Sequence, residues 1–168
     1  MTDAATGGTL APPDMRTFWR VLGTRPIGMT IVTARGADGP AGFVGLSAAH
    51  VSADPPTMLV SLDRKTSALG PIRDERAFAI NFLAKGQEAL GDLFGRRTAE
   101  YDERFASPDW GKLVTGAPVL TSALGAFDCE LERTVELPGA IIAIGRVVGW
   151  LAKDDGEPLT FFRGKYAV

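Results

Sequence analysis

Residues 42–67 read GFVGLSAAHVSADPPTMLVSLDRKTS, and the pattern of this stretch decides the fold. The corner Asp54-Pro55-Pro56 interrupts any strand, because proline offers no N–H to a β-ladder and restricts the residue before it. The segment 57–62 that follows is short, apolar and bounded by turns, which is typical of a buried strand. The stretch therefore predicts two extended segments joined at a proline corner.

Upstream of this stretch, the sequence predicts one helix and one hairpin. Asp14 can cap a helix whose apolar residues follow 3.6-residue spacing, and Gly23 can end it. The turn residues at 36–40 separate two extended segments, 27–35 and 41–52, which we expect to pair as a hairpin.

Downstream, short strands and helices follow one another. Ser67 is expected to cap a helix over 67–76, followed by a strand at 77–83, a helix over 87–97 and a polar loop at 98–116. The last third is strand-rich, with strands expected at 119–124, 126–137, 141–151 and 159–163. Strict alternation of strand and helix is absent, so a doubly wound parallel sheet is disfavoured. We expect a mainly β fold, a small closed or partly open antiparallel barrel with peripheral helices.

Composition restricts the classes of function. The chain has 168 residues, 18 Lys and Arg against 20 Asp and Glu, and a net charge of -2. This length indicates one domain, which we place at 14–168 after a disordered tail at 1–13. The net charge shows no basic excess of the kind expected for binding nucleic acid or an anionic membrane. No apolar run approaches the roughly 20 residues that span a bilayer. The start of the chain lacks the features of a secretory signal.

Few residues could act as acid–base or metal-binding groups. Cys129 is the only cysteine and His50 the only histidine, so neither an internal disulfide nor a Cys/His zinc site is expected, and a reducing cytoplasm fits best. No nucleotide-binding glycine motif, zinc-protease motif or serine-hydrolase elbow is present. His50 is expected to be an ordinary strand histidine. We therefore expect the chemistry to come from a bound organic cofactor.

Two neighbouring features fit such a cofactor. The small residues Gly45, Ser47, Ala48 and Ala49 would let a flat ligand approach the backbone closely. The loop 63–67 then offers two hydroxyls, two cations and a helix start, which together are typical of a phosphate site.

Motifs along residues 15–166 resemble those of the flavin reductase-like family, in the same order. The family stretch ending in S-x-D-P-P is matched by Gly42, Ser47, Ser52 and residues 54–56. Further matches are the KTS loop at 65–67, the strand FAINFL at 78–83, the helix at 87–94, the Arg104-Phe105 pair, the segment IGRV at 144–147 and the C-terminal segment 158–166.

The resemblance implies an antiparallel Greek-key split β-barrel that forms a homodimer and binds FMN or FAD. It places the isoalloxazine beside Val44, Gly45, Leu46, Ser47, Ala48 and Ala49. It places the ribityl chain along Ser61, Leu62, Asp63 and Arg64, and the phosphate at Lys65, Thr66 and Ser67. Asn81, Phe82, Leu83, Arg104 and Phe105 would close the site, although Asn81 and Phe105 fit structural roles equally well.

The resemblance also implies the activity, hydride transfer from NAD(P)H to the flavin and delivery of reduced flavin to an oxygenase partner. Many family members carry a histidine where this chain has Ala140, and His50 could partly replace it. Ala140 favours an alternative, a flavin-binding electron carrier without NAD(P)H turnover. A reductase of a non-flavin acceptor is a further alternative.

Overall fold

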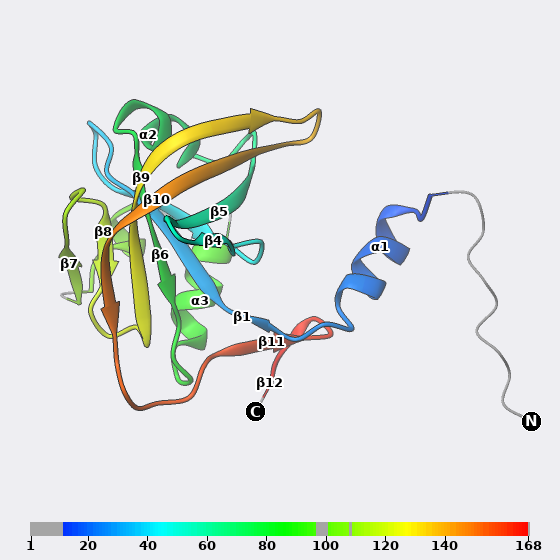
Figure 1. The fold of residues 1–168 in the computed structure, drawn as a ribbon. Helices are drawn as coiled ribbons and strands as arrows, with labels where there is room; N and C mark the ends of the chain where they lie inside the picture. Colours follow the sequence, from blue (N-terminus) through cyan, green and yellow to red (C-terminus); the bar gives the residue numbers. More distant parts are fainter. Residues whose placement is uncertain (1–11, 97–100, 108, 168) are drawn as a thin grey trace, which may run out of the picture.

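Seven antiparallel strands form the main sheet, in the order β3-β2-β6-β9-β10-β5-β4. The computed structural model describes residues 12–96, 101–107 and 109–167 (Figure 1). Nearly all of the tail expected at 1–13 therefore lies outside the described residues. The bounds of the seven strands are β2 Thr30–Ala34, β3 Ala41–Val44, β4 Ala49–Ala53, β5 Pro56–Asp63, β6 Ala77–Phe82, β9 Gly125–Glu136 and β10 Ala140–Ala152.

Shorter elements surround this sheet. The helices are α1 Met15–Leu22, α2 Leu69–Asp74, α3 Glu88–Gly95 and α4 Tyr101–Arg104. The remaining strands form two small sheets, one of β1 Ile27–Gly28, β11 Thr160–Phe162 and β12 Lys165–Ala167, and one of β7 Trp110–Lys112 and β8 Pro118–Leu120.

The segment 45–48 connects the two edge strands β3 and β4 and ties the two sides of the sheet together. Gly45 N–H donates to Thr30 O of β2 (2.9 Å), and Thr30 Oγ1 donates back to Gly45 O (2.5 Å). Two residues later, Ser47 Oγ accepts from Ser61 N–H of β5 (3.1 Å) and donates to Ser61 O (3.2 Å). The sheet thus curls into a barrel that is split between β3 and β4.

The connection from β5 to β6 skips the long hairpin of β9 and β10, which lies between them in the sheet (Figure 1). Such a return to a non-neighbouring strand is typical of Greek-key topology. The expected class, a mainly β antiparallel split barrel with peripheral helices, is confirmed.

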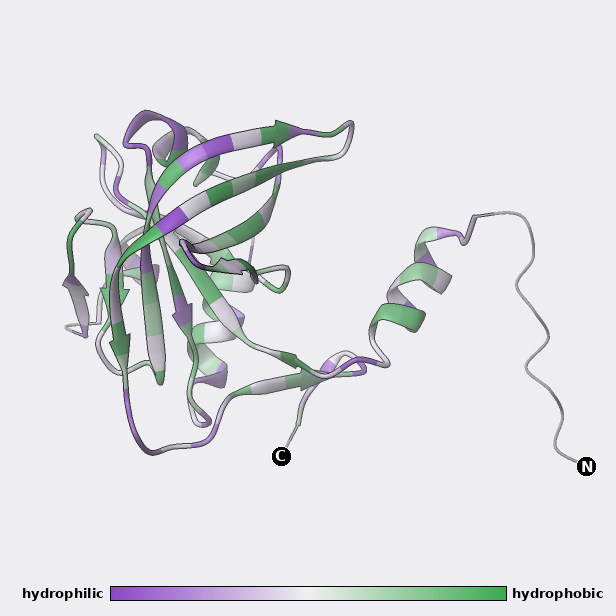
Figure 2. Cartoon of the chain, viewed as in Figure 1, coloured by the Kyte–Doolittle hydropathy of each residue, from purple (hydrophilic) through white to green (hydrophobic). Residues whose placement is uncertain are grey.

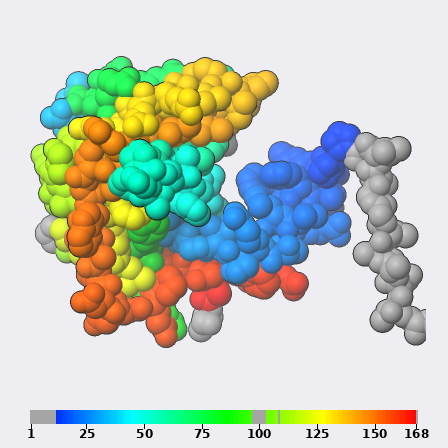
Figure 3. Space-filling model, viewed as in Figure 1, coloured from blue at the N-terminus to red at the C-terminus, as the bar shows by residue number. Residues whose placement is uncertain are grey.

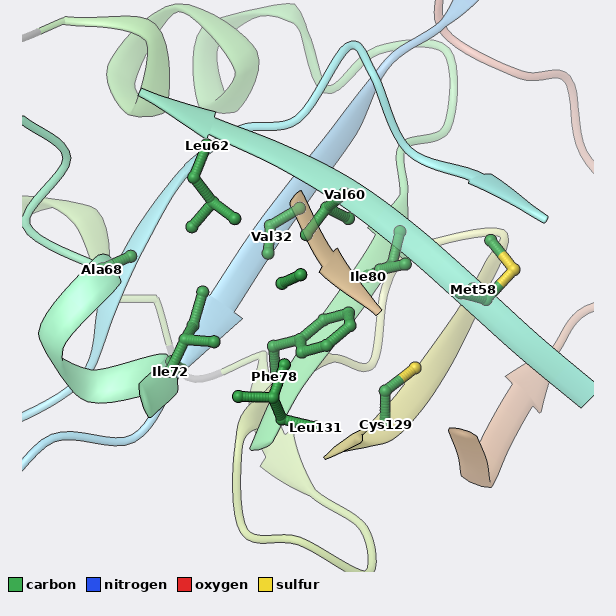
Figure 4. Packing of buried hydrophobic residues seen from close by; sticks show 12 residues of the cluster. Val32, Met58, Val60, Leu62, Ala68, Ile72, Phe78, Ile80, Cys129 and Leu131 are labelled. Atoms are coloured by element: carbon green, nitrogen blue, oxygen red, sulfur yellow. The ribbon is translucent and has the colours of Figure 1, made fainter. Parts of the chain in front are cut away.

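Three apolar clusters of described residues fill the interior, and the smallest comprises Ala79, Ala117, Val119 and Ala126. The first surrounds the fully buried Phe78 ring and includes Val32, Val60, Leu62 and Ile72 (Figure 4). The ring lies where a Cβ on Gly145 would come within 2.7 Å of Phe78 Cε1, so the absence of a side chain at 145 makes room for it. The second cluster lies beside α3 and is built from Met29, Ile31, Leu83, Phe94, Leu120, Ala123 and Leu159.

Several expected elements agree with the structure within one or two residues. Thr17 N–H donates to Asp14 Oδ1 (2.7 Å), and α1 ends at Gly23, as expected. The strands expected at 57–62 and 77–83 correspond to β5 and β6.

Three expectations need correction. The extended segment 41–52 is two strands, because the chain leaves β3 after Val44 and crosses to β5 before β4 begins. The proline corner does not lie wholly outside the strands. Pro56 is the first residue of β5 and lies opposite Ala53, because proline is tolerated at the first position of a strand. The segment 98–116 is not wholly a loop but contains α4 and β7.

Helix α1 projects from the barrel (Figures 1 and 3). None of its residues is buried, and the exposed fractions of Phe18 and Trp19 are 49% and 59%. Apolar and polar residues alternate around it (Figure 2). No helix in the described part of the chain is both long enough and apolar enough to cross a membrane.

Candidate cofactor site

A pocket of about 400 Å³ lies between β3, β5 and the chain that follows α3. We call it the cationic pocket. Its lining comprises Gly42, Phe43, Val44, Ser61, Asp63, Lys65, Thr66, Ser67, Phe94, Gly95, Arg96 and Arg104. Its volume lies within the range of small-molecule sites.

Positive charge dominates the cationic pocket. Lys65, Arg96 and Arg104 make no ion pair with a carboxylate among the side chains that the structure describes, those of residues 12–96, 103–107 and 109–167. The only acid in the lining, Asp63, accepts from Lys65 N–H through Oδ1 (2.8 Å). Three cations against one carboxylate favour an anionic ligand such as a phosphate.

Arg104 is held in place by the barrel. Its Nη1 donates to Gly42 O (3.3 Å), its Nη2 donates to Arg96 O, and its guanidinium carbon lies 5.9 Å from the centroid of the Phe94 ring. Its Nε is buried and has no hydrogen-bond partner among the described residues. A guanidinium with an unpaired buried N–H and no counter-charge among the described side chains is stabilised by an anion beside it. This feature fits a phosphate-bearing cofactor.

The hydroxyl groups of Thr66 and Ser67 line the same pocket and make no side-chain hydrogen bond within the described residues. Ser67 does not cap a helix, contrary to expectation. Helix α2 has six residues, its N-cap is Ala68, and no side chain caps it. The Ser67 hydroxyl is therefore available to a ligand, and the anion site depends on side chains rather than on the end of a helix.

A second pocket of about 410 Å³ continues from the first and shares Val44, Gly95 and Arg96 with it. We call it the apolar pocket, because Met29, Val44, Leu46 and Phe161 contribute to its lining. Tyr166 Oη donates to Asp92 Oδ1 at its rim (2.7 Å). Burial, followed by the bond to Asp92, raises the pKa of Tyr166 to about 12, so the hydroxyl stays neutral at physiological pH. An apolar wall beside a cationic pocket suits an aromatic ring that carries a phosphate tail.

The structure brings a set of the predicted site residues together at these pockets. Seven line the cationic pocket, namely Val44, Ser61, Asp63, Lys65, Thr66, Ser67 and Arg104. Leu46 lines the apolar pocket, and Phe105 lines a third pocket that also contains Ser67 and Arg104.

Other predicted residues point elsewhere. Arg64 pairs with Glu136 (2.8 Å) and donates to Leu137 O from Nη2 (2.7 Å), so its charge is directed to the β9–β10 hairpin. Leu62 belongs to the first buried cluster and Leu83 to the second, and the Phe82 ring packs edge-on against Phe127 at 5.6 Å.

The stretch of small residues also has a structural cause. A Cβ on Gly45 would come within 2.5 Å of Val32 Cγ2, so packing against β2 requires glycine there. Ser47 is bonded to β5, Ala48 packs against the first core cluster, and Ala49 is exposed opposite Leu59. The residues of this stretch that reach a pocket are the larger Val44 and Leu46.

Asn81 is fully buried and hydrogen-bonded on both sides of its amide. Its Nδ2 donates to Ile31 O (3.1 Å) and to Thr33 Oγ1 (3.3 Å), and its Oδ1 accepts from Leu120 N–H (2.8 Å). The side chain therefore joins β2, β6 and β8. Of the two roles open to it, the structure favours the structural one.

His50 is exposed on β4 and lines none of these three pockets.

Arg96 is a site residue that the sequence did not identify, and it lines both the cationic and the apolar pocket. A basic residue at the end of an amphipathic helix is usually a solvated one, so the sequence held no signal for it. Among the described residues, no group of three or more His, Cys, Asp or Glu is arranged to hold a metal.

Known proteins resemble the chain over most of its length. The family model described as "Flavin reductase like domain" matches residues 22–168. FMN reductase (NADH) RutF of Ancylobacter novellus is 36% identical over 167 residues, which cover 99% of this chain and 92% of that protein.

Two solved structures share the fold. NADH:FAD oxidoreductase SgcE6 of Streptomyces globisporus C-1027 superposes with a TM-score of 0.85 at 27% identity, covering 96% of this chain and 97% of that one. The styrene monooxygenase flavin reductase SMOB of Pseudomonas putida S12 superposes with a TM-score of 0.80 at 25% identity, covering 90% and 96%.

Proposed function

Because the chain belongs to the family of flavin reductase like domains, we propose that it is an NAD(P)H:flavin oxidoreductase that reduces FMN or FAD. The observation that carries the proposal is the pair of joined pockets, one apolar and one lined by three cations that pair with no carboxylate among the described side chains. Relatives named FMN reductase (NADH) and NADH:FAD oxidoreductase support both the flavin and the nucleotide.

Each part of the site has a role in holding the flavin. Lys65, Thr66, Ser67 and Arg104 would bind the phosphate, and Val44 and Leu46 would contact the ring. The flavin, when bound, supplies the acceptor atom for the hydride that NAD(P)H donates. The protein contributes by holding the two rings close together and by excluding water, neither of which requires a side-chain acid or base. The position of His50 outside the pockets agrees with this.

The proposed activity is tested by measuring NADH and NADPH oxidation by the purified protein, with FMN and with FAD as acceptors. We expect flavin-dependent oxidation of at least one nucleotide. Flavin binding without any nucleotide oxidation would contradict the reductase and identify the electron-carrier alternative. Reduction of a ferric chelate without added flavin would instead select the non-flavin acceptor.

A charge variant tests the site itself. Lys65→Gln removes one cation from the cationic pocket and should weaken flavin binding about tenfold or more, as expected for one lost charge-assisted hydrogen bond. The matched control is Lys112→Gln, which removes an exposed lysine on β7 outside the three pockets. Equal flavin affinity in the two variants would exclude Lys65 from the site.

The same proposal extends to partners. Reduced flavin would pass to an oxygenase, as the name of the styrene monooxygenase flavin reductase indicates for that relative.

We also propose that the protein is a homodimer, which the exposed apolar residues of α1 support. We propose further that it works in the cytoplasm, which its single cysteine supports.

A further inference from the structure

We propose that a third pocket binds the adenosine half of FAD, so that the protein prefers FAD to FMN. This inference rests on the proposed flavin site and concerns which flavin it takes. The pocket has a volume of about 610 Å³ and lies between the β2–β3 turn and α2. We call it the turn pocket. Its lining consists of residues 36–41, Ser67, Pro71, Asp74, Glu75, Arg104 and Phe105.

The three pockets form a row. The turn pocket shares Ser67 and Arg104 with the cationic pocket, and the cationic pocket shares Val44, Gly95 and Arg96 with the apolar one. Along this row the lining changes from apolar to cationic to acidic. FAD presents a tricyclic ring, a pyrophosphate and an adenosine in the same order. FMN ends at its single phosphate and would leave the turn pocket unused.

The carboxylates of the turn pocket suit a ribose. Glu75 is paired with Arg35, but Asp38 and Asp74 have neither a hydrogen bond nor an ion pair from their side chains within the described chain. A carboxylate can accept hydrogen bonds from the 2′- and 3′-hydroxyls of a ribose. The same charges would repel a 2′-phosphate. The pocket therefore selects an adenosine whose ribose is not phosphorylated.

The turn is already formed. Gly36 and Gly39 exchange backbone hydrogen bonds (3.1 and 3.2 Å), and a Cβ on Gly36 would lie 3.1 Å from Pro71 Cγ, so the turn packs directly on α2. Ala37, Pro40 and Pro71 give the pocket apolar surface for a base. Arg104 lies at the junction, where a pyrophosphate would pass from one pocket to the next.

The test is a titration of FMN and FAD followed by flavin fluorescence. We expect the wild-type protein to bind FAD at least tenfold more tightly than FMN. In the double variant Asp38→Asn, Asp74→Ala the FAD preference should fall to less than threefold, whereas the Kd for FMN should stay within twofold of wild type. Asn is chosen at 38 because it keeps the chemistry of the turn.

The matched control is the double variant Asp154→Ala, Asp155→Ala, which also removes two negative charges, from the exposed residues after β10. It should keep the full FAD preference. Equal affinities of wild type for FMN and FAD, or an unchanged preference in the Asp38, Asp74 variant, would overturn the proposal.

Three further outcomes separate the possible failures. A raised KM for NADH with FMN as acceptor, together with an unchanged FAD preference, would overturn the FAD assignment and give the turn pocket to the nicotinamide nucleotide. Failure to bind either flavin would contradict the proposed function itself. A protein that binds both flavins equally and still oxidises NADH would contradict only the adenosine site.

Discussion

Single residues in this barrel show how one side-chain property can serve either packing or binding. From the sequence, Gly45 is expected to leave room for a flat ligand because it has no Cβ. In the structure, the Val32 side chain occupies that room. The amide of Asn81 on β6 is equally compatible in sequence with a ligand contact or a contact between strands, and in the structure it is hydrogen-bonded to two other strands, β2 and β8. Both interpretations need the same residue type, so only the direction of the side chain separates them.

The role of Asn81 can be tested by Asn81→Ala. The substitution leaves Leu120 N–H buried without its acceptor and removes the side-chain hydrogen bonds to Ile31 O and Thr33 Oγ1, so we expect the free energy of unfolding to fall by about 2–4 kcal/mol. Urea denaturation measures this change. The Kd for flavin, corrected for the folded fraction, should stay within twofold of wild type. Thr24→Ala, which removes an exposed hydrogen bond to Val21 O, is the control and should cost less than 1 kcal/mol. Normal stability with lost flavin binding would instead assign Asn81 to the site.

Residues that converge from distant parts of the chain were the hardest to predict. Lys65, Thr66 and Ser67 are adjacent in sequence, so their hydroxyls and charge could be identified as an anion site without a structure. Arg96 joins them only because α3 packs against β3, where the Phe94 ring lies over Gly42. A tertiary contact of this kind leaves no local pattern.

At the scale of elements, strand and helix positions followed from local pattern, but pairing did not. The proline corner located β5, because proline offers no N–H to a β-ladder, and the spacing of side chains along the chain located β6 and α3. That β4 begins only after the chain has crossed from β3 to β5 depends on the hydrogen bonds of Gly45 and Ser47, which join residues 15 and 14 positions apart.

Helix α1 exposes apolar side chains that a second polypeptide would be expected to cover. An isolated eight-residue helix is marginal in water, and this one exposes Met15, Phe18, Trp19 and Val21. If a second copy covers this face, the double variant Phe18→Ser, Trp19→Ser should shift the mass in solution from that of a dimer to that of one 17.8 kDa chain. Light scattering after gel filtration gives the mass. Arg16→Ser, on the same helix, should leave it unchanged. A wild-type protein that is already monomeric at micromolar concentration would contradict the homodimer.

At the scale of the whole molecule, burial of the Cys129 thiol makes the free energy of unfolding depend on pH in the alkaline range. Burial, and to a lesser extent the charge of Asp128, raises the pKa of this thiol from its ordinary value near 9.0 to about 12. Below pH 9 the thiol is neutral in both the folded and the unfolded chain, so it adds no pH dependence. Between pH 9 and about 12 the unfolded chain releases the proton and the folded chain retains it. The free energy of unfolding therefore falls as pH rises, by at most about 4 kcal/mol across this interval.

Cys129→Ala isolates this contribution, because alanine leaves the remaining alkaline groups in place, including Tyr166, whose pKa is also raised. Urea midpoints of both proteins should be measured at pH 7.5, 9, 10 and 11. At pH 7.5 the variant should be less stable by about 1–2 kcal/mol, since it loses buried volume in the core around Phe78. That deficit should shrink steadily above pH 9 and approach zero or reverse by pH 11. Parallel curves over the whole range would mean that the barrel opens to hydroxide locally before it unfolds, and that its interior is less closed than the packing around Cys129 indicates.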